Sequence, residues 1–287
     1  MSAPVTVAAD STAVRVALWR ALHLEADAAP HVIHDDVGLK LAAPEGDWRA
    51  RPDMHPQHTA PFRASIIARS RFIEDQVIDG IKAGAARQYV LLGAGLDSFA
   101  LRRPDIAAQL AIFEVDQPGH QAWKQQRLAE LGLTPPASVH FVPVDFEAGD
   151  DWLKKLVKAG FRTDEPAMVT STGVSMYLTH DAIVAMLQQV ASLAQGSQLV
   201  MTFLLPIEMA DPALQPVLRM GEAGAAASGT PFISYFQPQE IVNLALAAGF
   251  SEVTHISADA LAERYFADRP DGLRPPARCE ELIVATV

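Results

Sequence analysis

A short apolar segment that runs into two glycines constrains the fold of this chain more than any other part of its sequence. Residues 89–92 (Tyr-Val-Leu-Leu) have the length and composition of a buried parallel strand. Gly93 and Gly95 follow at once, and because glycine has no Cβ, the backbone can turn sharply there and a ligand can approach it closely. Asp97 then opens a predicted helix, whose first N–H groups would face that ligand. This order of strand, G-x-G turn and helix predicts the nucleotide-binding edge of a doubly wound α/β sheet.

The residues of this turn favour one class of cofactor over another. The dinucleotide fingerprint G-x-G-x-x-G needs a third glycine where this chain has Ser98, which disfavours NAD. Asp97 offers a carboxylate that can hold an ammonium group, and S-adenosylmethionine (SAM) carries such a group without any pyrophosphate. The turn therefore favours SAM, with an NAD-dependent oxidoreductase as the alternative.

Helical and strand patterns alternate along the rest of the chain. Helices are predicted over residues 10–27, 62–83, 119–131, 151–159, 179–194 and 237–248. Further strands are predicted over residues 110–115, 139–144, 167–171, 198–205, 250–256 and 281–287. We expect the last two strands to pair antiparallel, which the six parallel strands of an NAD domain would not do. The pattern predicts a doubly wound, mostly parallel, seven-stranded α/β sheet with an antiparallel last strand.

This order of elements also predicts how the chain is divided. Residues 1–61 are expected to form a helical and loop segment that covers the active site, and residues 62–287 the SAM-binding domain. Residues 206–236 interrupt that domain, and an insertion of this length in an α/β unit often covers a substrate. We therefore expect it to act as a cap.

Acidic residues follow three of the predicted strands at the same edge of the sheet, at positions 97, 116 and 145. Asp116 lies 21 residues beyond Gly95, the usual distance for an acid that binds ribose hydroxyls. Glu114 shares its side of the strand, but Asp116 is favoured because it stands at the carboxyl end. Asp145 and Phe146 could bind an adenine amino group and pack on its ring.

Other polar side chains are candidates for the two ends of a ligand. Arg63, Arg69 and Arg71 lie on the helix that leads into the glycine turn, and one of them could pair with the cofactor carboxylate; a solvated helix face is the alternative. Tyr177 is expected to line the substrate pocket unless it belongs to the core. Arg219 could pair with an acidic acceptor, or be solvated.

Composition and charge exclude several classes of function. The net charge of −11 and the lack of a basic stripe argue against a nucleic-acid partner. One cysteine, Cys279, points to a reducing compartment, and with no signal peptide or long apolar run expected we predict a cytoplasmic protein off the membrane. The histidines of residues 30–61 fit no standard zinc spacing, so no metal site is predicted; they are His31, His34, His55 and His58.

Five segments together resemble the bacterial SAM-dependent methyltransferases of the leucine carboxyl methyltransferase family. They are residues 68–75 (ARSRFIED), 88–102 (through GAGLDSFALR), 113–118 (FEVDQP), 142–146 (VPVDF) and 173–178 (GVSMYL). The segments occur in the family's order and span residues 62–205, about half of the chain. Their combination is far more specific than any one of them.

The resemblance implies a class I methyltransferase fold and assigns roles to individual residues. It places Arg69 on the SAM carboxylate, Gly93 and Gly95 under the methionine part, Asp116 on the ribose, and Asp145 with Phe146 on the adenine. Relatives usually carry glutamate before the glycine of the GVSMYL segment, whereas this chain has Thr172. Thr172 is therefore a cofactor-site position whose contact differs from that of the relatives.

A methyltransferase mainly aligns the acceptor with the methyl group and excludes water. We predict O-methylation of a small molecule, with a carboxylate as the favoured acceptor because it is ionised at neutral pH. A phenol would need a base, for which His180 and His120 are candidates, although a helix-start or surface position is the favoured interpretation of each. Methylation of a protein C-terminus and a non-catalytic SAM-binding role stay open.

Overall fold

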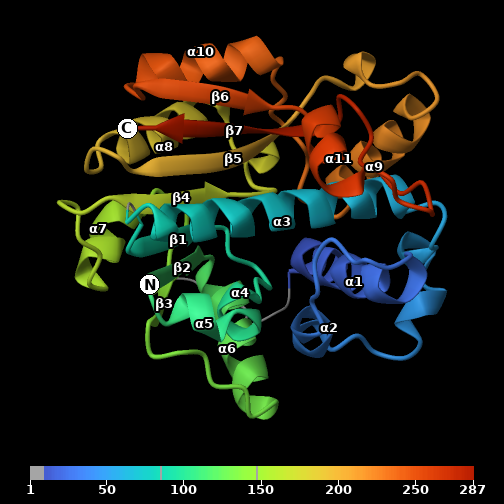
Figure 1. Ribbon diagram of the computed structural model, residues 1–287, viewed down its shortest axis with the longest axis horizontal. Helices are drawn as coiled ribbons and strands as arrows, with labels where there is room; N and C mark the ends of the chain where they lie inside the picture. Colours follow the sequence, from blue (N-terminus) through green and yellow to red (C-terminus); the bar gives the residue numbers. More distant parts are fainter. Residues whose placement is uncertain (1–9, 85, 147) are drawn as a thin grey trace.

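The computed structural model describes residues 10–84, 86–146 and 148–287, and its centre is one seven-stranded sheet (Figure 1). The strand order is β3-β2-β1-β4-β5-β7-β6, in which β1 to β5 are parallel and β7 runs antiparallel between β5 and β6. The strands are β1 (Gln88–Leu92), β2 (Ala111–Asp116), β3 (Val139–Pro143), β4 (Ala167–Ser171), β5 (Gln198–Leu204), β6 (Glu252–Ile256) and β7 (Glu280–Thr286). The predicted mostly parallel sheet with an antiparallel last strand is confirmed.

Alternate side chains of the central strands build one apolar core on each face of the sheet. Val90 and Leu92 of β1 point into one cluster, and Tyr89 and Leu91 point into the other. The first cluster also takes side chains from α7 (Trp152–Lys158), α8 (His180–Ala191) and α10 (Pro238–Ala248). The second takes them from α3 (Ala60–Lys82), α4 (Phe99–Arg102), α5 (Pro104–Ala107) and α11 (Ala258–Phe266). All five residues of β1 are buried, as a strand covered on both faces requires.

The N-terminal segment forms a third apolar cluster beside the sheet. Its helices are α1 (Ser11–Ala26) and α2 (Val37–Ala42), followed by the short 3₁₀ turns η1 (Trp48–Ala50) and η2 (Pro52–Met54). Asp10 begins α1 as predicted, because its carboxylate accepts the Thr12 N–H at 2.8 Å. Leu96 of the glycine loop packs into this cluster, so the segment contacts the nucleotide-binding edge directly.

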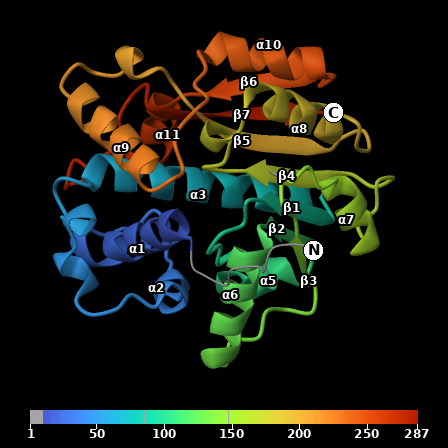
Figure 2. The same ribbon diagram turned by 180° about the vertical axis from the view of Figure 1, so that it is seen from behind.

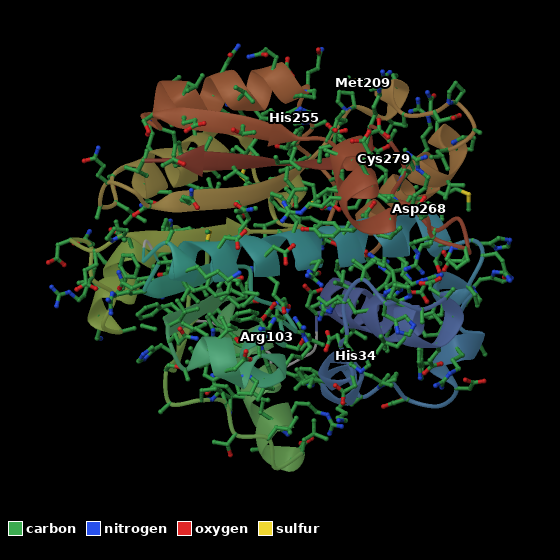
Figure 3. All side chains as sticks on the ribbon, viewed as in Figure 1. His34, Arg103, Met209, His255, Asp268 and Cys279 are labelled. Atoms are coloured by element: carbon green, nitrogen blue, oxygen red, sulfur yellow. The ribbon has the colours of Figure 1, made fainter. Side chains whose placement is uncertain are left out.

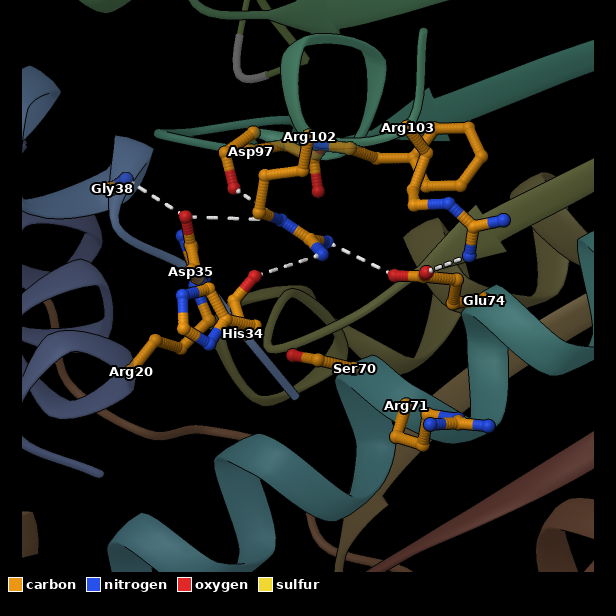
Figure 4. A network of polar contacts seen from close by, with 12 residues as sticks. Arg20, His34, Asp35, Gly38, Ser70, Arg71, Glu74, Asp97, Arg102 and Arg103 are labelled. Carbon is orange, nitrogen blue, oxygen red and sulfur yellow. Dashed lines mark hydrogen bonds and ion pairs between the residues drawn. The ribbon is translucent and has the colours of Figure 1, made fainter. Parts of the chain in front are cut away.

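A buried ionic network also fastens the N-terminal segment to the glycine loop (Figure 4). Arg20 of α1 donates to Asp35 at 2.6 Å and to the Leu96 carbonyl at 2.9 Å. Arg102 lies between Asp35 and Glu74 and donates to Glu74 at 3.1 Å. Charged groups this far from solvent are stable only when paired, so the network fixes the segment against the loop.

Residues 206–236 leave the sheet after β5 and contain η4 (Ile207–Met209) and the helix α9 (Gln215–Ala227). No residue of α9 is buried. Figure 2 shows α9 and α1 at the same end of the sheet, on either side of α3. The Ile233 N–H donates to the Met176 carbonyl at 2.8 Å, which ties the insertion to the loop after β4.

The predicted helix after the glycine turn is present but short, and one further helix was not predicted. The helix after the glycine turn is only the four-residue α4, because Pro104 cannot continue it and Arg103 leaves the helical region at φ −122° and ψ 59°. α11 lies between the last two strands, where no helix was predicted; Ser257 caps it by accepting the Ala260 N–H. The remaining helix, α6 (Pro118–Glu130), is close to its predicted bounds.

Candidate active site

The carboxyl ends of β1, β2 and β4 open into a cavity of about 1890 Å³. This position, outside the strand ends of an open α/β sheet, is where such folds bind ligands. A pocket for one small molecule usually has about 300–1,000 Å³, so this cavity has room for a cofactor and an acceptor. The predicted residues that line it are Arg69, Gly93, Gly95, Asp97, Asp116, Phe146, Thr172 and Tyr177.

The glycine loop is tightly packed against the protein itself. Gly93 has φ +75°, and a Cβ built on it would lie 2.4 Å from Cγ2 of Val174, far inside a normal contact. Gly95 has φ +50°, and its Cβ would lie 3.1 Å from that of Ala13 on α1. Both positions therefore need glycine because of backbone conformation and close protein packing.

Four N–H groups of this loop are already used within the protein. Those of Gly93 and Ala94 donate to the Val115 carbonyl at 2.9 and 3.0 Å, and that of Gly95 donates to the Asp116 carboxylate. Asp97 N–H donates to the Ala94 carbonyl at 2.9 Å. A pyrophosphate is normally held by free N–H groups at such a loop. The loop therefore suits a cofactor without a pyrophosphate, as SAM is, better than NAD.

Asp116 and Glu114, which the sequence left as rivals, lie in different surroundings. Asp116 lines the cavity, and its second oxygen accepts the Gln117 N–H at 2.6 Å. Burial raises the pKa of Asp116, although its backbone N–H donors oppose the rise. Glu114 does not line the cavity and pairs with Lys124 at 2.5 Å. Asp116 therefore lines the cavity at the end of β2, and its predicted ribose contact stays a prediction. Glu114 holds the loop through Lys124, which also donates to the Asp97 carbonyl at 2.8 Å.

The two residues predicted to bind adenine are placed differently. Phe146 lines the cavity, but Asp145 does not. One carboxylate oxygen of Asp145 accepts the Ala148 N–H at 3.0 Å, and its own N–H donates to Asp150 at 2.9 Å. The structure therefore gives Asp145 a role in shaping its loop, and its predicted adenine contact stays a prediction.

Arg69 reaches the cavity wall from α3 and forms an ion pair with Glu280, the first residue of β7. Each of the two side chains is 11% exposed. A Cβ built on Gly173 would lie 3.1 Å from the Arg69 guanidinium, so this arginine also lies against the loop after β4. Arg63 and Arg71, the other two candidates on α3, pair with Asp27 and Asp75 outside the cavity.

Aromatic and cationic side chains line the cavity around Tyr177. The Tyr177 ring lies 5.6 Å from that of Phe232 in the insertion. Burial raises the pKa of Tyr177; the Thr12 side chain and the charges of Arg15 and Arg69 act against the rise. Arg15 lines the cavity from α1 and forms no ion pair within the described part of the chain.

Of the three remaining candidates, Arg219, His180 and His120, only His120 lines the cavity. Arg219 is 54% exposed, pairs with Glu208 at 2.8 Å and does not line the cavity. His180 is exposed and packs near Phe236, again outside the lining. His120 lines the cavity, but on the ribose side, with its Nδ1 3.9 Å from Asp116.

Burial raises the pKa of Cys279 to about 11, so this thiol next to β7 (Figure 3) stays protonated at neutral pH.

Three of the lining residues that sequence reasoning missed are Glu280, Arg15 and Ser171, and two of these had a readable signal. Glu280 precedes the predicted last strand, whose antiparallel direction brings its first residue to the ligand-binding edge. Arg15 lies on the predicted first helix, and only the packing of that helix shows that its side chain lines the cavity. Ser171 ends the predicted fourth strand, and its buried hydroxyl has no hydrogen-bond partner among the described residues. That hydroxyl is free for a ligand.

Comparison with known proteins decides the family. The model of the leucine carboxyl methyltransferase family matches residues 13–191. The chain belongs to this family. The provisionally named SAM-dependent methyltransferase YktD of Bacillus subtilis is 32% identical over 212 residues, which cover 72% of this chain and 67% of YktD. A relative with the same description from Mycobacterium avium is 30% identical over 272 residues, 91% of this chain and 89% of the relative.

The fold agrees with this membership. A crystal structure described as a methyltransferase from Thermobifida fusca matches with a TM-score of 0.59 at 19% identity, over 95% of this chain and 93% of that one. This leucine carboxyl methyltransferase family member is a class I SAM-dependent methyltransferase, and its cofactor is SAM. Among its described residues no helix is long and apolar enough to span a membrane, and no cluster of His, Cys, Asp and Glu could hold a metal ion.

Proposed function

We propose that this protein transfers the SAM methyl group to a carboxylate oxygen of a small apolar acid and forms a methyl ester. The observation behind this proposal is the positive charge at the acceptor end of the cavity. Arg15 lies there without an ion-pair partner among the described residues, and its guanidinium is 5.8 Å from the centre of the Trp19 ring. A half-buried cation in such a cleft attracts an anionic acceptor.

The titratable groups near this end support an acceptor that needs no deprotonation. The raised pKa of Tyr177 keeps its hydroxyl neutral, so it can donate a hydrogen bond but not act as a base. His180 lies outside the cavity, and His120 lies beside Asp116. His58 lines the exposed rim, stacked on His55 at 3.9 Å. A carboxylate is already ionised at neutral pH, whereas a phenol is not.

The walls around Arg15 indicate the rest of the acceptor. They are largely apolar and come from α1, α3, the loop after β4 and the insertion; the lining residues include Trp19, Phe62, Ile66, Met176, Phe232 and Met220. Apolar walls beside a cation that has no ion-pair partner among the described residues suit an acid with an apolar body. Met220 of α9 is 73% exposed, and a bound acceptor would cover such a side chain.

Each group of cavity residues would then have its own role in methyl transfer. When bound, SAM supplies an electrophilic methyl group, and its sulfur leaves as a neutral thioether while the acceptor oxygen gains the C–O bond. Asp116 and Phe146 would hold the nucleoside end, and Arg69 the amino acid end. Arg15 would hold the acid while it is charged and release it once the ester is neutral. α1 and the insertion would exclude water from the reacting atoms.

The test is transfer of a radiolabelled methyl group to a panel of apolar carboxylic acids and matched phenols. A methyl ester releases methanol in mild alkali, whereas an aryl ether keeps the label. We expect alkali-labile product from acids. Arg15→Gln should raise KM for the acid about 10- to 100-fold, because a hydrogen-bonded ion pair contributes about 1.5–3 kcal/mol. Its affinity for SAM should not change.

Arg219→Gln is the matched control, since it removes the same charge from an exposed, paired position. It should leave KM within about twofold of wild type. Alkali-stable label from phenols would contradict the carboxylate proposal. A rise in KM for Arg219→Gln but not for Arg15→Gln would indicate that the insertion, and not α1, binds the acceptor.

A further inference from the structure

The ion pair between Arg69 and Glu280 joins parts of the chain that are 211 residues apart. Arg69 comes from the middle of α3, and Glu280 pairs with Leu204 at the carboxyl end of β5. Because β7 is antiparallel to β5, its first residue lies at the edge where the parallel strands end. Both side chains line the cavity, beside Thr172 and Gly173. The cavity wall thus presents one positive and one negative group next to each other.

This arrangement complements the amino acid end of SAM, which carries a carboxylate and an ammonium group on the same carbon. Arg69 suits the carboxylate, because a guanidinium can donate two parallel hydrogen bonds to it. The Glu280 carboxylate suits the ammonium, and with 11% exposure it is already largely removed from water. Binding would exchange one ion pair for two without leaving a buried charge unpaired.

Neighbouring residues fit that role less well. Thr172 lines the same wall but has no charge. Asp97, which the sequence favoured as the ammonium ligand, uses its Oδ1 to accept the Phe99 N–H at 2.9 Å and so orders its own loop. We propose that Glu280 binds the α-ammonium group of SAM. This inference rests on the cofactor alone and not on the nature of the acceptor.

The test compares three ligands by isothermal titration: S-adenosylhomocysteine, its deaminated analogue that keeps the carboxylate, and 5′-methylthioadenosine, which lacks the amino acid end. Glu280→Gln has nearly the same shape as wild type. We expect it to weaken S-adenosylhomocysteine about 10- to 100-fold. The other two ligands should bind within about twofold of their wild-type affinity, because neither has an ammonium group.

Asp97→Asn is the matched comparison, since it neutralises the rival carboxylate at the same cavity. We expect it to weaken S-adenosylhomocysteine less than Glu280→Gln does. Equal weakening of the deaminated analogue by Glu280→Gln would overturn the proposal, because Glu280 would then only hold Arg69 in position. The proposal would also be overturned if Asp97→Asn, and not Glu280→Gln, abolished the difference in affinity between S-adenosylhomocysteine and its deaminated analogue.

Wild type provides a reading that does not depend on the folding of a variant. It should bind the deaminated analogue at least about tenfold more weakly than S-adenosylhomocysteine, because that ligand has no ammonium group to form a hydrogen-bonded ion pair with Glu280. Equal affinities would refute an ammonium contact by any acid. All of these measurements are binding affinities for cofactor analogues, so a failure to find a methyl acceptor would not affect them.

Discussion

Replacing Gly93 by alanine tests whether the glycine loop is fixed by packing against the loop after β4. At φ +75°, alanine is strained, and its Cβ would lie 2.4 Å from Cγ2 of Val174. A left-handed conformation costs a residue other than glycine about 1–2 kcal/mol. Overpacking of this kind costs about 1–3 kcal/mol more. We expect Gly93→Ala to lower the free energy of unfolding by about 2–5 kcal/mol.

Val174→Ala separates the two contributions, because it removes the methyl group that the new Cβ would strike. In a double-mutant cycle measured by urea unfolding, Val174→Ala should recover about 1–3 kcal/mol of the free energy of unfolding that Gly93→Ala loses. The cost of placing alanine at positive φ should remain. Gly132→Ala is the control: Gly132 also has positive φ, at +65°, but no atom lies within 4 Å of its built Cβ. It should lose about 1–2 kcal/mol, whether or not Val174 is replaced.

The result that would refute this reasoning is a coupling energy near zero between positions 93 and 174. Gly93→Ala would then be no worse than Gly132→Ala, and the close approach would not limit this loop. Titration of the same variants with S-adenosylhomocysteine measures the functional consequence. Affinity should fall in Gly93→Ala and partly return with Val174→Ala, because the loop carries the cavity wall next to Asp97.

Three further predictions concern the acids of the site and the N-terminal segment. Asp116→Asn should weaken S-adenosylhomocysteine about 10- to 100-fold by titration, because it removes the charge that would strengthen the predicted hydrogen bonds from ribose; unchanged affinity would remove Asp116 from the site. Lys124→Met should cost about 3–5 kcal/mol in urea unfolding, since it leaves Glu114 buried without its partner, and adding Glu114→Gln should recover most of it. His23 is buried with a lowered pKa, chiefly because of desolvation, and accepts the Val32 N–H at 3.0 Å, so the unfolded chain takes up its proton at a higher pH than the folded chain does. Stability should therefore fall as pH drops below about 6.5, and a His23→Gln variant that lost stability just as steeply would refute this assignment.

Several features of the site follow from sequence because they depend on local pattern and strand ends. The apolar segment before Gly93, the acid at Asp116 and the antiparallel last strand were all readable. A buried parallel strand needs a continuous apolar run, and the carboxyl ends of such strands meet at one edge. Residues at those ends are therefore close together whatever their separation along the chain.

Other features depend on how distant elements pack, and no local pattern encodes them. Asp145 follows a strand as Asp116 does, yet its carboxylate turns into its own loop to accept the Ala148 N–H. Arg219 and Arg15 look alike in sequence, but one pairs with Glu208 at the surface and the other lines the cavity. The choice between them is made by the packing of α1 over the glycine loop, which brings Ala13 against Gly95.

The sequence by itself predicted the fold class, the cofactor and the edge of the sheet where we expect the cofactor to bind, because periodicity and strand-end residues are local properties. Tertiary structure alone decided which charges face one another across the cavity. Glu280 meets Arg69 because the last strand inserts antiparallel beside β5, in a register that places its first residue at that edge. Such a contact is set by strand order and register across the whole sheet, which are properties of the folded chain.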